Sequence, residues 1–189
     1  MSPETWHFTD TYGWLDRSLV QVYPFSTPRW KDKGVERLIA LFAHLLERHR
    51  LNVLLVLATA HSNTPSIDDK YLNEIEDCGR RFGLEPDKHL VLTSRYADRQ
   101  AEMYPQYADR WHRWRYSVPE NVLREFFTLA DIFVFPSRSE GCSLIQAEAA
   151  LAGNHVVVNR DFQAMCEFGL DFSLHYNFSS KEPHDIYWQ

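Results

Sequence analysis

Apolar residues along this chain follow two alternating patterns, one typical of amphipathic helices and one typical of buried strands. Between Val35 and Arg50 they recur every three or four residues, which predicts a helix with one apolar face. Residues 53–57 are continuously apolar and of strand length, as expected for a parallel strand covered on both faces. The same alternation predicts further strands at residues 19–23, 90–92, 132–135 and 156–158, and further helices at about 69–82, from Pro119, and after Pro136.

Strands that alternate with helices in this way predict an α/β fold with a single Rossmann-like, doubly wound parallel sheet, whose ligands bind at the carboxyl ends of the strands. The 189 residues suffice for one such domain with short ends. We expect residues 1–18 to be a linker or the remnant of a preceding element, residues 19–178 to form the domain, and residues 179–189 to be a tail. Residues 97–116 exceed what the connection needs and are expected to be an insertion.

Charge and composition argue against several classes of function. A formal net charge of −6 disfavours general nucleic-acid binding, so an anionic ligand needs a local basic cluster. Cys78, Cys142 and Cys166 lack CxxC spacing and the nine histidines lack HExxH spacing, so neither a disulfide framework nor a metal site is indicated. The absence of an apolar run of about 18 residues and of a signal peptide predicts a cytoplasmic protein without membrane contact.

The most informative segment is residues 137–148, which follows the strand expected at 132–135. It carries two carboxylates eight positions apart, Glu140 in the loop and Glu148 in the next helix. Ser143 and Gln146 have the spacing of a capping box, which predicts that a helix begins there. Loop amides at such a helix N-terminus face an anionic or polar ligand. Neither GxGxxG nor GxxxxGK[ST] occurs, so the two commonest phosphate-binding motifs do not explain this loop.

The helical period also predicts where Glu148 points. At about 3.6 residues per turn, Glu148 shares a face with Leu144, Leu151 and Ala152, so we expect its carboxylate on or beside the side that packs toward the sheet. A charge in that position needs polar partners, and ribose hydroxyl groups would serve.

Four motifs in order, over about 150 residues, give the chain a family resemblance. From Leu19 to about Gly169 it resembles the C-terminal, donor-binding domain of retaining GT-B glycosyltransferases, specifically glycosyltransferase family 4. The motifs are Lys33-Gly34 before a long helix, Ala130-Asp131 through Pro136-Ser137, Glu140-Gly141 through Glu148-Ala149, and Ala152-Gly153 before the strand expected at 156–158.

The resemblance implies a role for each matching position. Glu140, the catalytic residue of the set, would accept hydrogen bonds from the donor sugar, and Glu148 would hold the ribose. Lys33, with Arg29 from the same loop, would neutralise the diphosphate leaving group without a metal ion. The remaining donor-binding positions supply backbone amides and are Gly141, Cys142, Ser143 and Leu144.

The chain also departs from the family pattern. Tyr23-Pro24-Phe25 stands where the family has a glycine and an arginine, and Arg29 comes later in a longer loop. Ser143 replaces a usual glycine, and His155 replaces a usual proline. The insertion at 97–116 carries tyrosines, tryptophans and arginines, which either pack a lid, dock a neighbouring domain, or stack on sugars or single-stranded nucleic acid.

The implied function is to bind a nucleotide diphosphate sugar for retaining transfer of a hexosyl group in carbohydrate metabolism. A complete GT-B enzyme carries its acceptor site on a second Rossmann domain, for which this chain has no room. We therefore expect half an enzyme, whose partner is an N-terminal acceptor domain in cis or on another subunit, with no cofactor and no nucleic acid. The alternatives are a non-catalytic module that binds a nucleotide sugar or docks a partner, and a fragment of a GT-B nucleotide-sugar epimerase.

Several of these residues also have an interpretation that needs no ligand. Glu140 can stabilise a helix N-terminus by its charge, and Glu148 can reach toward water. Lys33 can be a solvated loop residue, and Cys142 a structural one, because no histidine is placed by sequence to activate it.

Overall fold

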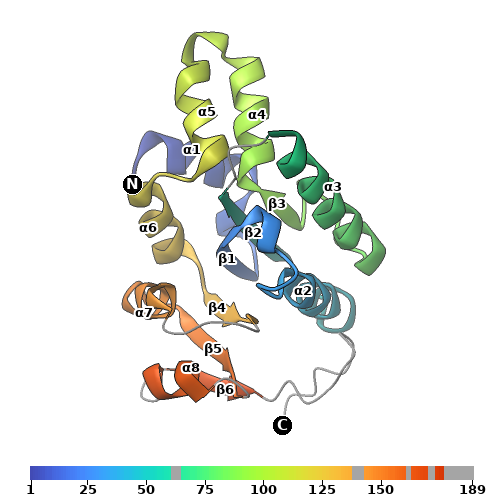
Figure 1. Cartoon of the computed structure of the whole chain (residues 1–189), viewed down its shortest axis with the longest axis vertical. Helices are drawn as coiled ribbons and strands as arrows, with labels where there is room; N and C mark the ends of the chain where they lie inside the picture. Colours follow the sequence, from blue (N-terminus) through green and yellow to red (C-terminus); the bar gives the residue numbers. More distant parts are fainter. Residues whose placement is uncertain (61–64, 138–142, 161–162, 170–172, 177–189) are drawn as a thin grey trace.

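The computed structural model describes residues 1–60, 65–137, 143–160, 163–169 and 173–176, which form one parallel sheet with helices on both sides (Figure 1). Its six strands lie in the order β3-β2-β1-β4-β5-β6, and every neighbouring pair is parallel. The doubly wound α/β fold expected from the sequence is confirmed. The strands are β1 (Leu19–Ser26), β2 (Val53–Ala60), β3 (Leu90–Leu92), β4 (Ile132–Phe135), β5 (His155–Asn159) and β6 (Ser173–Tyr176).

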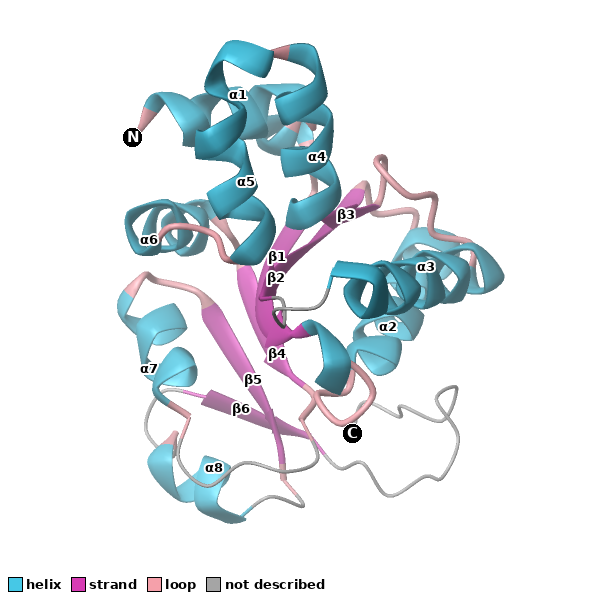
Figure 2. Cartoon of the chain, turned by 45° about the horizontal axis from the view of Figure 1, so that its top comes forward, coloured by secondary structure: helices cyan, strands magenta, loops and turns pink. Residues whose placement is uncertain are grey.

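The expected helices are present with small shifts in their ends, and further helices occur where no period was visible. Figure 2 shows α2 and α3 on one side of the sheet and α6 and α7 on the other. The helices are α1 (Pro3–Thr11), α2 (Val35–His49), α3 (Pro65–Phe82), α4 (Thr93–Met103), α5 (Ala108–Tyr116), α6 (Glu120–Leu129), α7 (Leu144–Leu151) and α8 (Gln163–Phe168), and short 3₁₀ turns span Trp14–Asp16, Thr27–Arg29 and Pro105–Tyr107.

The residues before β1 are ordered, although their sequence shows no helical period. Ser2 caps α1, and Phe8 on its buried face is inaccessible to solvent. The carboxylate of Glu125 on α6 accepts hydrogen bonds from the Ser2 amide at 2.8 Å and from the Thr5 hydroxyl group. Residues 1–18, which the sequence suggested as a linker or remnant, thus begin with a helix that is hydrogen-bonded to α6.

The segment expected as an insertion forms most of a helical hairpin made of α4 and α5, and its aromatic residues divide into two groups. Trp111 and Trp114 are buried, with ring centroids 5.4 Å apart, and Trp114 also lies 5.9 Å from the ring of Tyr96. Tyr104 and Tyr107 at the tip are exposed. The buried rings belong to an aromatic cluster that joins α1, α4, α5 and α6 and comprises Phe8, Tyr96, Trp111, Trp114 and Phe126.

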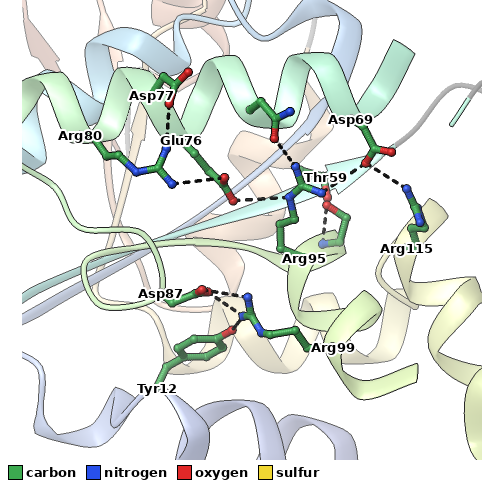
Figure 3. A network of polar contacts seen from close by, with 12 residues as sticks. Tyr12, Thr59, Asp69, Glu76, Asp77, Arg80, Asp87, Arg95, Arg99 and Arg115 are labelled. Carbon is green, nitrogen blue, oxygen red and sulfur yellow. Dashed lines mark hydrogen bonds and ion pairs between the residues drawn. The ribbon is translucent and has the colours of Figure 1, made fainter. Parts of the chain in front are cut away.

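Ion pairs fasten the hairpin to α3. Figure 3 shows Arg95 of α4 and Arg115 of α5 converging on the carboxylate of Asp69, at 3.3 and 3.1 Å. On the other side of α4, Arg99 binds Asp87 at 2.6 Å and donates a hydrogen bond to the Tyr12 hydroxyl group at 2.6 Å. The arginines of the segment at 97–116 therefore include two with structural roles, Arg99 and Arg115.

Candidate functional site

The candidate site lies where the strand order reverses, between β1 and β4. Chain connections after these two strands leave in opposite directions, which opens a crevice at their carboxyl ends. The loop after β1 carries Lys33 and Gly34, and the loop after β4 carries the segment that resembles the family's paired-glutamate motif. The topology therefore brings the two halves of the expected site to one place.

A close backbone approach joins these two loops. Gly34 has a φ of 71°, which glycine adopts at little cost, and it precedes α2 directly. A methyl group on Gly34 would overlap the carbonyl oxygen of Pro136 and lie 2.9 Å from the Pro136 Cβ. Only a glycine fits this contact without a shift of either loop, which gives the Lys-Gly motif a physical reason.

Polar side chains define the seam between β1 and β4. The strands share one register pair, Gln21 with Ile132, near the amino end of β4. Beyond it, the buried Gln21 amide donates to the carbonyl of Val134 at 2.8 Å and accepts from its N–H at 3.3 Å. Asp131 accepts a hydrogen bond from the Val20 amide at 2.7 Å. A side-chain amide thus takes the place of a backbone ladder where the crevice opens.

The loop after β1 holds two cations near each other. Partial burial, and then the charge of Arg29, lower the pKa of Lys33, whereas Asp32 acts in the opposite direction. Arg29 is exposed, and its Nε lies 4.0 Å from the Asp32 carboxylate. The Tyr23 hydroxyl group donates to the Lys33 carbonyl at 2.9 Å and so fixes the loop backbone. Tyr23, which stands in the family's arginine region, was not expected to have this role.

The start of α7 differs from the expected capping box. Ser143 is the N-cap residue, as the sequence indicated, but its side chain makes no capping hydrogen bond. The Gln146 side chain is fully buried and donates to the carbonyl of Met165 at 3.2 Å instead of returning to the cap. The capping-box prediction is therefore wrong, because Gln146 is used to pack α7 against α8.

The orientation of α7 also corrects the position expected for Glu148. Ala149 is fully buried, whereas Leu144 and Leu151 are 69% and 89% exposed and Glu148 is exposed between them. The prediction that Glu148 lies on or beside the sheet side is wrong, since the small alanine rather than the leucines packs inward. An exposed Glu148 needs no buried partner and is accessible to a ligand.

Three of the predicted positions, Glu140, Gly141 and Cys142, lie outside the described residues. Lys33, Arg29, Ser143, Leu144 and Glu148 are described and belong to the two loops, or to the helix after the second loop, at the switch point. Their ligand roles rest on the family resemblance, so these assignments stay predictions.

A feature that the sequence did not indicate lies at the carboxyl ends of β2 and β3. The Thr93 hydroxyl group, at the first position of α4, accepts a hydrogen bond from the Thr59 amide at 3.1 Å. The Thr59 hydroxyl group accepts in return from the Ser94 amide at 3.3 Å. This reciprocal pair lets α4 begin directly after β3 without a loop, and only the Thr-Ser sequence after an apolar run could have signalled it.

Within the described ranges, histidines, cysteines and carboxylates form no group of three or more that could hold a metal ion. Within the same ranges, no helix combines the length and the hydropathy needed to cross a membrane.

Comparison with solved structures finds glycosyltransferases. WaaG, a glycosyltransferase involved in lipopolysaccharide biosynthesis, matches 98% of this chain over 41% of its own, with a TM-score of 0.62 and 15% identity. A UDP-forming α,α-trehalose-phosphate synthase from Burkholderia xenovorans matches 95% of this chain over 36% of its own, with a TM-score of 0.63 and 16% identity. The C-terminal domain of the LpcC glycosyl transferase from Francisella tularensis matches 83% of this chain over 64% of its own, with a TM-score of 0.55 and 17% identity.

No protein-family profile matches the sequence, and no curated protein sequence matches it significantly. The chain spans less than half the length of WaaG and of the trehalose-phosphate synthase. At identities below 20%, the likeness concerns the fold. The chain has the Rossmann-like fold of the C-terminal half of a GT-B glycosyltransferase.

Proposed function

We propose that this chain binds a nucleotide diphosphate sugar as the donor half of a larger retaining glycosyltransferase of the hexosyltransferase type. The observation that carries the proposal is the contact of Gly34 with Pro136, which joins the Lys-Gly loop to the loop before α7 at the switch point. The solved structures of similar fold are glycosyltransferases, and three of them are UDP-forming trehalose-phosphate synthases, which supports this ligand class.

In this proposal, Lys33 and Arg29 face the diphosphate. Burial, and then repulsion from Arg29, lower the pKa of Lys33, and an anion between the two cations relieves that repulsion. The amides of Gly141, Cys142, Ser143 and Leu144 face the diphosphate and the sugar. Because the chain itself supplies this positive field, we expect binding to be equal in magnesium and in chelator.

The two glutamates have separable roles in the proposal. Glu148 binds the ribose and thus contributes to both the free nucleoside diphosphate and its sugar conjugate, whereas Glu140 contacts the sugar. A hydrogen bond to a charged group is worth about 1.5 to 3 kcal/mol, so Glu148→Ala should weaken both ligands about 10 to 100-fold. Glu140→Ala should spare the diphosphate and reduce the preference for the conjugate.

Calorimetric titration with UDP and UDP-glucose tests these roles, and two glycine variants test the site itself. Gly34→Ala should weaken UDP at least tenfold, because the new methyl group overlaps Pro136. Gly153→Ala is the matched control, since Gly153 also has a positive φ, of 95°, but has open space where a methyl group would lie. Equal losses in both variants, or wild-type binding by Gly34→Ala, would contradict the site.

If the chain is instead a non-catalytic module, the titrations should give the same affinities, but no glycosyl transfer should appear when an acceptor domain is supplied. Adding a purified GT-B acceptor domain in trans, or expressing the two halves together, would separate the two. Robust transfer by this chain alone would contradict the half-enzyme proposal, because one domain cannot position an acceptor across a cleft.

A further inference from the structure

A pocket lies at the opposite end of the strands from the candidate donor site, where α2 and α3 end side by side. It has a volume of about 670 Å³, which is within the range of small-molecule sites, and it opens to solvent. We call it the arginine groove and define it by Leu46, Arg50, Leu51, Arg80, Arg81 and Phe82. Leu51 and Asn52 in its lining directly precede β2, so the groove lies at the amino ends of the strands.

The lining of the arginine groove is amphipathic. Leu46, Leu51 and Phe82 are partly buried and pack against the core, so they give the groove an apolar floor. Arg50, Arg80 and Arg81 are exposed on its rim, and Glu47 is the one carboxylate of the lining. Three guanidinium groups around an apolar floor concentrate positive charge in a chain whose net charge is −6.

The arginines of the rim differ in how far they are already neutralised. Arg80 pairs with Asp77 at 2.7 Å and with Glu76 at 3.7 Å on its own helix. Arg50 and Arg81 form no ion pair within the described part of the chain. The Arg81 guanidinium, however, lies beside the Cys78 thiol, and Arg81 also lines a second pocket with Glu36, Glu74 and Asp77. Arg50 therefore has the guanidinium group that an anion can engage, and a guanidinium binds a phosphate through paired N–H donors.

Arg50 occupies a backbone position that favours glycine. It ends α2 with a φ of 57°, and its amide donates to the Leu45 carbonyl as in a left-handed helix cap. The neighbouring helix α3 ends in the same groove with Gly83, whose φ is 92°. Both helix ends therefore have a positive φ, which favours glycine. At the end of α2 this position is occupied by Arg50, whose side chain lines the groove.

We propose that the arginine groove binds a phosphorylated amphiphile, a phosphate group joined to an apolar chain. Arg50 holds the phosphate, and Leu46, Leu51 and Phe82 contact the apolar chain. This ligand differs from the proposed donor, and its site lies at the far end of α2, a helix of 15 residues and thus about 22 Å long. The groove is therefore a second site, separate from the one formed by Lys33 and Gly34.

Octyl phosphate below its micelle concentration is the probe, with inorganic phosphate and 1-octanol as its two halves. Fluorescence or calorimetric titration of the whole chain should show octyl phosphate binding at least tenfold more tightly than either half. Equal binding of inorganic phosphate would mean a nonspecific anion site, and equal binding of octanol would mean apolar adsorption. Either result would overturn the proposal.

Arg50→Gly is the decisive variant, because it removes the guanidinium and installs the residue that the backbone favours. It should weaken octyl phosphate at least tenfold while the thermal midpoint stays equal or rises. Arg48→Ala removes the same charge from the same helix end but lies outside the groove lining, and it should change binding less than twofold.

UDP titration separates this proposal from the proposed donor site. Arg50→Gly should bind UDP as the wild type does, and Gly34→Ala should bind octyl phosphate as the wild type does. Wild-type binding of octyl phosphate by Arg50→Gly, or an equal loss in Arg48→Ala, would refute the assignment of the arginine groove whatever the UDP result.

Discussion

The helices α1, α4, α5 and α6 and the helix α7 pack in different ways. The layer of α1, α4, α5 and α6 is locked by large rings, among them Trp114 and Phe126, and by ion pairs such as Arg115 with Asp69. Helix α7 packs through the fully buried Gln146 and Ala149 and the partly buried Ile145, and its leucines are exposed. The large buried rings stabilise the first group of helices. Helix α7 instead lies close to the sheet, and its exposed face carries Glu148 at the candidate site.

The largest effect is expected in the aromatic cluster. Trp114→Ala removes a side chain that is 1% exposed and leaves a cavity among Tyr96, Trp111 and Phe126, so the free energy of unfolding should fall by about 3 to 5 kcal/mol. Urea denaturation measures it. Tyr107→Ala, at the exposed tip of the same hairpin, should change stability by less than about 0.5 kcal/mol. Comparable losses would show that the hairpin tip is also packed.

A smaller effect is expected from enlarging the contact of α7. Ala149→Leu places a larger side chain where Ala149 is fully buried, and the strain should cost about 1 to 3 kcal/mol of unfolding free energy. Leu151→Ser on the same helix should change it by less than about 0.5 kcal/mol, because Leu151 is 89% exposed. The reverse order would show that α7 is rotated to the orientation that its leucines suggest.

The smallest effect, and the one with a defined pH dependence, concerns the anchor of α1. Hydrogen bonds from the Thr5 hydroxyl and then from the Ser2 amide lower the pKa of Glu125 to about 2. Its contribution to stability is therefore present above the ordinary pKa of 4.5 and is lost as the pH falls toward 2. Glu125→Gln should lower the unfolding free energy by about 1 kcal/mol at neutral pH.

Denaturation series at several pH values measure this dependence. The difference between wild type and Glu125→Gln should shrink between about pH 5 and pH 2. Glu120→Gln is the control, because Glu120 begins the same helix but is 79% exposed and pairs with the exposed Arg124. A difference that stays constant over this range would contradict the role of the Glu125 carboxylate.

The sequence predicted those elements whose local pattern determines their structure. The strands read as continuous apolar runs because both faces of the sheet are covered, and α2 reads as a helix because one face meets the core. Helix α7 has apolar residues on nearly every side, so its period could not show whether Leu144 or Ala149 packs inward. Helix α1 was missed because its anchor, Glu125, is 120 residues from Thr5.

For the candidate site, the motifs predicted which loops meet but not how they are held. Gly34 and Lys33 were found by resemblance. The contact of Gly34 with Pro136 depends on how the distant strands β1 and β4 are placed, and the hydrogen bond from Tyr23 depends on the path of the loop after β1. The same limit applies to the insertion. Deleting residues 97–116 would be expected to unfold the chain rather than remove a docking surface, because Trp111 and Trp114 are part of the core.

Gln21 gives the sheet an internal boundary. On one side β3, β2 and β1 are joined by full backbone ladders, and on the other side β4, β5 and β6 are joined in the same way. The two halves meet through one register pair, the hydrogen bonds between Val20 and Asp131, and one buried amide side chain. In hydrogen exchange they should behave as two cooperative units, and since the Lys33 and Ser143 loops belong to different units, breathing of this boundary would change the width of the crevice between them.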